Sequence, residues 1–410
     1  MKIRKFIQII FITCFIFFLV AAMYFTVDNK DKEFSYYENR NYAKMPVISK
    51  ASFYEGTYLD ELDTFLNDHS AFRDGFVRLQ TYLDAVVLKR PVVNDIVVTD
   101  EALLAYKDYI TPDEESIKQK ADDIAQMNNA LRKKVESYGG TYIYTAVPCQ
   151  YACYEDAYPS YLNNMSAFTD LEIGYLSEYM AKYGVNFIDM LPVFQSADDP
   201  LGAERVGESL FYSSRIDNHY DAVGGYIVYK AIVDMINDKT EYNLDFPEGD
   251  DIKFIAHELP YRGSRTRKLM DTVNINEHIH RVEFSEKLPI KQYSGPYEVP
   301  VKLYDEEYSV TDGMITYGYY MGGDLPQTII DTDRDDLPSV LIYGDSFTNT
   351  VEVMAYYSFN KMHTLDLRHY DEMTIQQYID KYKPEIVVCI RDYEAVLSLT
   401  GNGEIGNKPV

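Results

Sequence analysis

The chain has 410 residues, a formal net charge of −26, 39 Tyr, 20 Phe and no Trp. This length allows one large domain or two ordinary ones, with enough apolar content for a sizeable core. A strongly acidic surface repels polyanions, so the composition argues against nucleic acid as a partner.

The N-terminus predicts a membrane anchor. Met1–Lys5 is basic, and Phe6–Val27 is predominantly apolar. At about 1.5 Å per residue this run spans a hydrocarbon core of about 30 Å, and the leading positive charge predicts a cytoplasmic N-terminus. We therefore predict that residues 1–27 are a cytoplasmic stub and single-pass anchor, with the bulk of the chain extracytoplasmic. The alternative is a signal peptide cleaved near Val20-Ala21-Ala22.

The cysteines do not predict a metal site. Cys149 and Cys153 are close in sequence and, outside the cytoplasm, could form a local disulfide. Cys389 lies in the apolar run 386–390, which is typical of a small buried hydrophobe.

Residues 28–100 are predicted to be a separate N-terminal extracytoplasmic segment. Helical periodicity covers 54–88, and 94–100 has the composition of a strand and turn.

Helices and strands alternate in the predicted catalytic domain, residues 101–410. A capping box at Thr111-Pro112-Asp113-Glu114 predicts a helix that ends at Gly139-Gly140. A strand over 141–147, a helix over 170–183 and a strand over 185–189 follow. This alternation predicts an α/β fold with a parallel sheet flanked by helices.

The periodicity weakens over about 241–336, which predicts an insertion of loops and short strands near the functional edge of the sheet. His278 and His280 would share one face of a strand, where a metal ion could bind. No third ligand is evident nearby, and we predict neither a metal nor a cofactor.

The C-terminal third has the clearest pattern, a βαβαβ unit. Its strands are expected at 340–343, 362–367 and 385–390, with right-handed crossovers between them. Sites in such sheets lie at the carboxyl ends of the strands. Ser346 follows one such end, and Arg368 and Asp392 follow the other two.

Ser346 is the candidate nucleophile. It follows a buried strand and a Gly turn, and it stands at the start of a helix, where free N–H groups can hold negative charge. A nucleophilic Ser needs this environment because its attack creates an oxyanion. The alternative is that Asp345 or Ser346 only caps the helix.

Asp217 and His219 form the second candidate pair. They lie two residues apart in a loop that precedes a helix capped by Asp221. In an extended loop their side chains project to the same side, so the carboxylate can orient the imidazole and stabilise its charged form. The alternative is that both side chains only bond to the local backbone.

Taken together, the chain resembles the DHHW protein family, which is related to alginate O-acetyltransferase-like proteins of SGNH-hydrolase-like fold. The order of short matching pieces carries the resemblance: Glu38-Asn39-Arg40, 68–74, 215–225, Gly263-Ser264, 317–323, Asp345-Ser346-Phe347 and Leu365-Asp366-Leu367-Arg368. The motif that names the family, Asp-His-His-Trp, stands here as Asp217-Asn218-His219-Tyr220. Its first His is replaced by Asn and its Trp by Tyr.

The resemblance implies a triad in the chain order Asp217, His219, Ser346, which is permuted relative to ordinary SGNH hydrolases. His219 would take the Ser346 proton, and Asp217 would hold the His219 tautomer. The backbone N–H of Ser346 is a candidate oxyanion donor.

Three further residues are candidates for substrate binding. Gly263 and Tyr319 are candidates for a second oxyanion donor. Arg368 either contacts the substrate or pairs with a carboxylate of the acidic surface.

The resemblance also implies the function: an extracytoplasmic O-acetyltransferase or acetylesterase acting on a cell-surface or secreted polysaccharide. A membrane-bound O-acyltransferase would be the partner that delivers the acetyl group. The alternative from another class is a non-catalytic cell-wall protein that binds glycan through its Tyr-rich surface. A metal-dependent hydrolase is disfavoured by the scarcity of clustered His.

Overall fold

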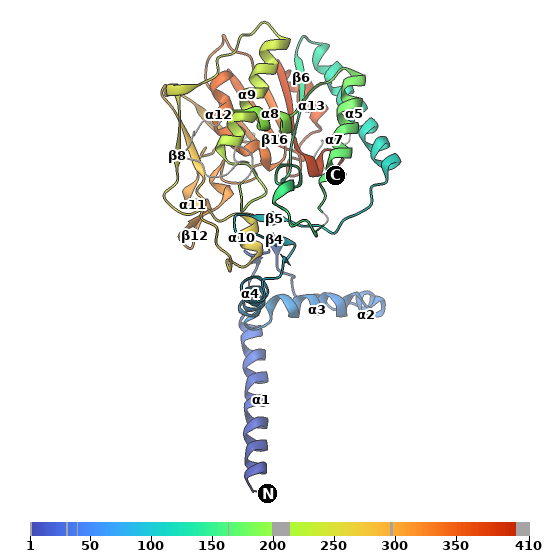
Figure 1. Cartoon of the computed structure of the whole chain (residues 1–410), viewed down its shortest axis with the longest axis vertical. Coiled ribbons are helices and arrows are strands. Elements are labelled where there is room, and N and C mark those ends of the chain that lie inside the picture. The colour runs from blue at the N-terminus through green and yellow to red at the C-terminus, as the bar shows by residue number, and fades with distance from the viewer. Residues whose placement is uncertain are drawn as a thin grey trace. The chain divides into compact units, whose positions relative to one another are not determined.

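The structure is a computed structural model that describes residues 2–29, 32–38, 40–162, 164–198, 214–295 and 298–398. The chain divides into two compact units. The first, the N-terminal unit, comprises Met1–Val98 and Thr266–Asn274. The second, the sheet unit, comprises Thr99–Arg265 and Ile275–Val410. Figure 1 colours the chain from blue to red along its length.

The N-terminal unit is mainly helical. Its elements are α1 Lys2–Asp28, β1 Phe34–Ser35, β2 Arg40–Asn41, α2 Lys50–Glu55, α3 Thr57–His69, α4 Arg73–Tyr82, the π-helix η2 Leu83–Val87, β3 Val92–Val93 and β4 Ile96–Val98. Within α1, the window Arg4–Ala21 has a mean hydropathy of 2.0 and is not buried, so by length and composition this helix could cross a membrane. Asn39, part of the Glu38-Asn39-Arg40 piece, lies outside the described residues.

The turn predicted near residues 94–100 is a tight hairpin. β3 and β4 pair antiparallel, and the two residues between them, Asn94 and Asp95, have φ values of 50° and 60°. A two-residue turn that matches strand twist requires positive φ at both positions, and Asn and Asp tolerate it best.

The sheet unit is built on one large sheet. The described residues give it eight strands in the order β11-β10-β14-β16-β15-β17-β6-β7. The strands β16 (Lys361–Asp366), β15 (Val340–Gly344), β17 (Ile386–Asp392), β6 (Thr141–Val147) and β7 (Asn186–Asp189) pair in parallel. The three strands of the C-terminal βαβαβ unit lie side by side at its centre, with almost every residue buried, as an apolar run covered on both faces requires.

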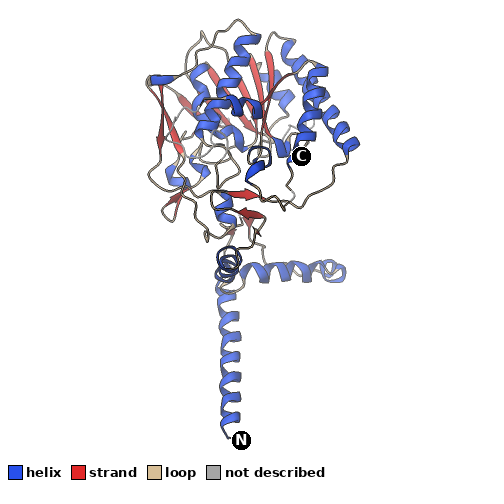
Figure 2. Cartoon of the chain, in the orientation of Figure 1, coloured by secondary structure: helices blue, strands red, loops and turns tan. Residues whose placement is uncertain are grey.

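The remaining elements are the sheet strands β10, β11 and β14 and the elements around the sheet, of which α10 contains residues of both units. They are β5 Leu103–Ala105, α5 Glu114–Glu136, α6 Gln150–Cys153, η3 Glu155–Ala157, α7 Ser166–Tyr183, α8 Met190–Ser196, α9 Ala222–Lys239, η5 Gly249–Asp251, β8 Ile252–Ala256, α10 Ser264–Lys268, β9 His280–Phe284, β10 Lys291–Ser294, β11 Val299–Pro300, α11 Glu306–Ser309, β12 Val310–Thr311, β13 Met314–Ile315, η6 Tyr317–Tyr319, β14 Gln327–Asp331, η7 Ser346–Thr348, α12 Asn349–Ala355, η8 Tyr356–Ser358, α13 Ile375–Tyr382 and η9 Tyr393–Ala395. Figure 2 shows helices flanking the strands of the sheet, so the predicted α/β fold class is confirmed.

One predicted helix start differs from the structure. The sequence placed Thr111 as the cap of α5 and Pro112 at its first position, but the N-cap is Asp113, whose side chain accepts a hydrogen bond from the Ser116 N–H. Asp caps a helix as well as Thr does, and Glu114 and Glu115 then lie in the first turn, where the helix dipole favours them.

The stretch predicted as an insertion, about 241–336, contributes to the main sheet as well as to loops. β14 pairs antiparallel with β16, and β10 pairs antiparallel with β14. β14 satisfies the backbone groups of β16 that would otherwise form an exposed sheet edge, and β10 does the same for β14. No disulfide joins Cys149 and Cys153, and Cys389 is buried, as predicted.

Candidate functional site

The nucleophile turn follows the central strand β15. Asp345 is the N-cap of the short 3-10 helix η7, and its side chain accepts the Phe347 N–H at 3.0 Å. Ser346 is therefore the first helical residue, and α12 begins three residues later. The last position of β15, residue 344, requires Gly because a Cβ there would lie 2.1 Å from the Ile390 carbonyl oxygen of β17.

A buried ion pair with the neighbouring strand β17 holds this turn in place. Arg391, at the end of β17, places a guanidinium nitrogen 3.0 Å from the second carboxylate oxygen of Asp345. Both side chains are more than nine-tenths buried. Because one oxygen of Asp345 caps η7 and the other pairs with Arg391, the carboxylate ties the turn before Ser346 to the neighbouring strand.

The loop before α9 brings His219 to Ser346. Its Nε2 lies 2.8 Å from the Ser346 Oγ, and its Nδ1 lies 2.7 Å from the Asp217 Oδ1. The structure thus brings together all three residues that the sequence predicted as a triad. With the Nδ1 proton directed to the carboxylate, Nε2 is free to accept the Ser346 hydroxyl proton.

Asp217 is held ionised by its partners. It is 2 % exposed, and burial alone would raise the pKa of its carboxyl. The His219 side chain and the backbone N–H groups of His219 and Ser264 bond to the carboxylate and outweigh burial, which holds its pKa well below the usual range. A charged Asp217 is what stabilising an imidazolium at His219 requires.

Gly263 supports this loop and is not seen as an oxyanion donor. A Cβ at position 263 would lie 2.1 Å from the Ile216 carbonyl oxygen, so only Gly allows the two backbones to approach this closely. The approach brings the Ser264 N–H to Asp217. Gly263 thus positions Asp217, and its expected role as an oxyanion donor stays a prediction.

Tyr317 completes the site and was not singled out from the sequence. Its ring stacks on the His219 imidazole, with centroids 3.8 Å apart and planes 6° apart. Its hydroxyl donates to the Ser346 carbonyl oxygen at 2.7 Å. One side chain thus contacts both the base and the nucleophile's backbone. The only sequence signal was its place in the 317–323 piece of the family resemblance.

The two altered positions of the Asp-Asn-His-Tyr motif have distinct contacts. Tyr220 is 1 % exposed, and its hydroxyl donates to the Phe347 carbonyl oxygen beside the nucleophile. The Asn218 side-chain oxygen accepts the Ser264 hydroxyl at 2.8 Å, which leaves its Nδ2 3.4 Å from the His219 Nε2. This amide is the side-chain donor that the structure places beside the reacting pair.

The structure places the other two sequence candidates elsewhere. Tyr319 is 1 % exposed in an aromatic cluster with His257, Tyr304 and Tyr320, so we correct its assignment to a packing role. Arg368 pairs with Asp366 and, at 3.0 Å, with Asp324. Of the two alternatives for Arg368, the structure shows the carboxylate pairing.

Comparisons with known proteins show the fold. No protein-family model and no curated protein matches the sequence. The structure of Bacillus cereus PatB1 is similar at 16 % identity, with a TM-score of 0.58, over 73 % of this chain and 96 % of that one. A DHHW family protein from Eubacterium siraeum is similar at 17 % identity, with a TM-score of 0.53, over 75 % and 93 %.

This chain has the fold of that DHHW family protein. The O-acetyltransferase domain of Pseudomonas putida AlgJ is also found, at 13 % identity and a TM-score of 0.45, over 74 % of this chain and 92 % of that one. The fold shared with PatB1 and with the DHHW family protein confirms the fold resemblance inferred from the short sequence pieces.

No His-rich metal site accompanies the DHHW fold in the part of the chain that the structure describes. His278 bonds to the His257 carbonyl oxygen, and His280 lies 3.3 Å from Asp221. The described side chains offer one group that could hold a metal, Asp324, Asp366 and His369, with ligand atoms within 4.8 Å of one another. Arg368 already pairs with both carboxylates of this group.

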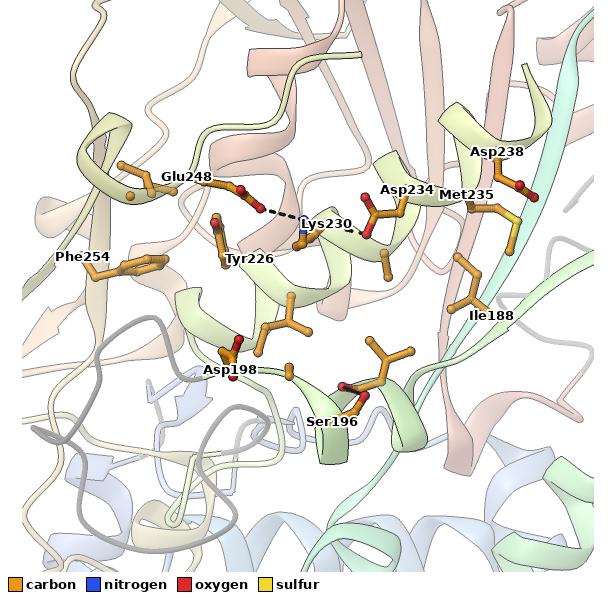
Figure 3. Close-up of a pocket in the computed structure, with 16 residues that line it drawn as sticks. Ile188, Ser196, Asp198, Tyr226, Lys230, Asp234, Met235, Asp238, Glu248 and Phe254 are labelled. Carbon is orange, nitrogen blue, oxygen red and sulfur yellow. Dashed lines mark hydrogen bonds and ion pairs between the residues drawn. The ribbon is translucent and has the colours of Figure 1, made fainter. Parts of the chain in front are cut away.

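A pocket of about 720 Å³ lies beside α9, away from the triad (Figure 3). Its lining is largely apolar, and Lys230 pairs there with Glu248 at 2.7 Å and with Asp234 at 3.9 Å. None of the three triad residues lines it.

Proposed function

We propose that this chain is an extracytoplasmic O-acetyltransferase, or acetylesterase, that acts on a cell-surface or secreted polysaccharide. The observation that supports it most is the convergence of Asp217, His219 and Ser346 at hydrogen-bond distances. The polysaccharide substrate follows from the sequence resemblance to alginate O-acetyltransferase-like proteins. The shared fold with a DHHW family protein is consistent with it.

In the first half-reaction, the Ser346 Oγ attacks the acetyl carbonyl carbon while its proton passes to the His219 Nε2. Asp217 stabilises the imidazolium that forms. The tetrahedral intermediate then collapses, and the leaving group takes the proton back from Nε2. The product is an acetyl ester on Ser346 with His219 neutral again.

In the second half-reaction, a sugar hydroxyl attacks the acetyl-Ser346 ester and gives its proton to the His219 Nε2. Collapse returns this proton to the Ser346 Oγ and leaves the acetyl group on the sugar. Water in place of the sugar makes the same site an esterase, so exclusion of water decides between the two activities.

The oxyanion of both intermediates needs donors near Ser346. The Ser346 backbone N–H at the start of η7 is the first donor that we propose. The Asn218 Nδ2 is the second, because Ser264 holds its oxygen and directs its amide toward the reacting pair. This role gives a chemical reason for Asn where the family motif has His.

The apolar helix α1 would anchor the chain in the cytoplasmic membrane as a single-pass protein. A sugar O-acetyltransferase outside the cytoplasm needs an acetyl donor delivered across the membrane. We propose a membrane-bound O-acyltransferase as the partner that supplies it. The non-catalytic glycan-binding alternative does not require a triad, so the distances around His219 count against it.

The test is covalent labelling of the detergent-solubilised full chain. Incubation with p-nitrophenyl acetate should add one acetyl group, seen by intact mass spectrometry, and Ser346→Ala should remove it. Ser339→Ala, on the same strand segment but bonded to Glu385, is the matched control and should retain the label. Because PatB1 has been solved with a sulfonyl adduct, a sulfonyl fluoride is a second probe of the same hydroxyl.

Addition of candidate oligosaccharides to the acetylated protein then separates transfer from hydrolysis. Transfer gives an acetylated sugar, whereas hydrolysis gives only acetate. Folded wild-type protein that takes neither label would contradict the nucleophile assignment.

A further inference from the structure

The helix pair α4 and η2 exposes one apolar face. Phe72, Phe76, Leu79, Leu83 and Val87 recur every three or four residues, so they share one side of the helix. Four of the five are more than half exposed: Phe76 is 57 % exposed, Val87 56 %, and Phe72 and Leu79 54 % each. We call these five side chains the apolar stripe.

The opposite face of the same helices is the buried one. Thr81, Asp84 and Ala85 are buried within the N-terminal unit, and they are smaller or more polar than the stripe residues. A water-facing helix has the reverse arrangement, with its large apolar side chains inward. Since removing apolar surface from water is favourable, the stripe fits a non-aqueous surrounding.

One contact places the start of the stripe at the end of the anchor. The Ala71 N–H donates to the Thr26 Oγ1 of α1 at 3.1 Å. Thr26 is near the end of the apolar run Phe6–Val27, which is long enough for a hydrocarbon core of about 30 Å. The residue after Ala71 is Phe72, so the stripe begins where α1 would leave the hydrocarbon.

The flanking side chains also suit a membrane interface. Tyr24 and Tyr82 are 67 % and 45 % exposed, and Tyr is enriched where hydrocarbon meets headgroups. Arg78 and Lys89 are exposed, and among the described residues neither has an ion-pair partner. Although the whole chain is acidic, these two cationic side chains flank the apolar stripe, where lipid phosphates would contact them.

We propose that α4 and η2 lie in the headgroup region of the outward-facing leaflet, with the apolar stripe inserted among the acyl chains. The inference rests on the proposed membrane anchor and adds a second lipid contact to it. An amphipathic helix at an interface buries its apolar face about 5 to 10 Å deep. The partner is the bilayer itself, and a second copy of the chain or a membrane protein are the competing occupants.

The absence of Trp from the sequence makes a direct test possible. Full-length Phe76→Trp carries the only Trp in the stripe and is reconstituted in phosphatidylcholine–phosphatidylglycerol liposomes with or without brominated acyl chains. Tyr24→Trp reports whether α1 is inserted. Tyr308→Trp, at a 66 % exposed site of the sheet unit, is the water-exposed control.

The expected result is that brominated lipid quenches Phe76→Trp as strongly as Tyr24→Trp, whereas Tyr308→Trp keeps its emission. Quenching of Tyr24→Trp alone would overturn the inference and leave the anchor intact. Quenching of neither would overturn both. Unquenched but blue-shifted Phe76→Trp emission that depends on the protein-to-lipid ratio would overturn it in favour of a protein partner.

Discussion

The sheet edge that carries Ser346 and the apolar stripe of α4 depart from the ordinary globular pattern in opposite ways. At the sheet edge, charged and polar groups are buried, and Asp217 and Asp345 each have several partners. On the stripe, large apolar groups are exposed. Burying an ionised group without partners costs several kcal/mol, and exposing apolar surface costs about 25 cal/mol per Å².

The difference shows what kind of function each departure indicates. Buried charge that is fully hydrogen-bonded is a fixed arrangement, suited to chemistry that needs oriented groups. An exposed apolar face is incomplete by itself and indicates a surface that is covered in use. Substitutions at the sheet edge should therefore change the rate of the reaction, and those on the stripe should change attachment to the membrane.

The largest effect is expected at the base. His219→Gln removes the acceptor of the Ser346 proton, and loss of such a group from a triad lowers kcat by about a million-fold. The measurement is the rate of acetyl-enzyme formation. His278→Gln is the matched control, since that ring bonds only to the His257 carbonyl oxygen, and it should keep the wild-type rate. Equal losses of the acetylation rate in His219→Gln and His278→Gln would contradict the assignment of His219 as the base.

Asp217→Asn tests whether the buried carboxylate orients His219. The amide no longer fixes the required tautomer and cannot stabilise the imidazolium, so kcat should fall about 10⁴-fold. The thermal unfolding temperature should also fall, because the Asn amide nitrogen would face one of the two backbone N–H groups, of His219 or Ser264, that the carboxylate accepts, so kcat is compared per folded molecule. A variant that unfolds without losing activity per folded molecule would contradict the assignment.

Glu352 lies buried on the helix that follows Ser346, and it tests stability against pH. Burial raises the pKa of its carboxyl to about 7, although the hydrogen bonds that the Thr348 and Thr364 hydroxyls donate to it act to lower this pKa. A pKa raised in the folded state gives stability that is complete below about pH 4.5 and is lost as the pH rises through about 7.

Glu352→Gln should abolish this loss, which is on the order of 3 kcal/mol. The measurement is denaturant unfolding across that pH range. Glu115→Gln, whose carboxylate is 87 % exposed on α5, is the control and should follow the wild-type profile. A wild-type profile that is flat between pH 4.5 and pH 7 would contradict the prediction.

Tyr317 is a positioning residue with two separable contacts. Tyr317→Phe removes the hydrogen bond to the Ser346 carbonyl oxygen and should lower kcat about threefold to tenfold, since such a bond contributes about 1 kcal/mol. Tyr317→Leu also removes the stack of the ring on His219, and this loss should raise the activation free energy by a further amount of about 0.5 to 1.5 kcal/mol. KM should stay the same in both.

The pH profile of kcat distinguishes this role from a structural one. Loss of the ring over His219 should shift the profile in Tyr317→Leu, but Tyr319→Leu, in the neighbouring aromatic cluster, should lower stability and leave the profile unchanged. Identical behaviour of the two variants would show that Tyr317 only packs.

The smallest effect is expected on the stripe. Leu79→Ala, at a 54 % exposed position, should change the free energy of unfolding by less than about 0.5 kcal/mol in detergent. Leu131→Ala, fully buried on α5, should cost about 2 to 5 kcal/mol. A similar cost at both positions would mean that the stripe packs against protein.

Much of the molecule is decided locally. Apolar runs predicted β15, β16, β17 and β6, and the capping residue Asp221 predicted the start of α9, because burial and terminal hydrogen bonds depend on neighbours in sequence. Ser346, Asp217 and His219 were also found from the sequence, since a turn after a strand and an Asp-x-His loop are local patterns.

Tertiary structure alone decided which distant groups meet. Arg391 behind Asp345, Tyr317 over His219 and Ser264 beneath Asp217 each join segments far apart in the chain. β14 reached the main sheet from a stretch expected to be an insertion, because a strand edge can be completed by any strand in reach. The placement of Tyr319 and Arg368 likewise depended on packing and charge supplied by other elements. The sequence by itself determined the reacting groups, and the tertiary structure decided what holds them.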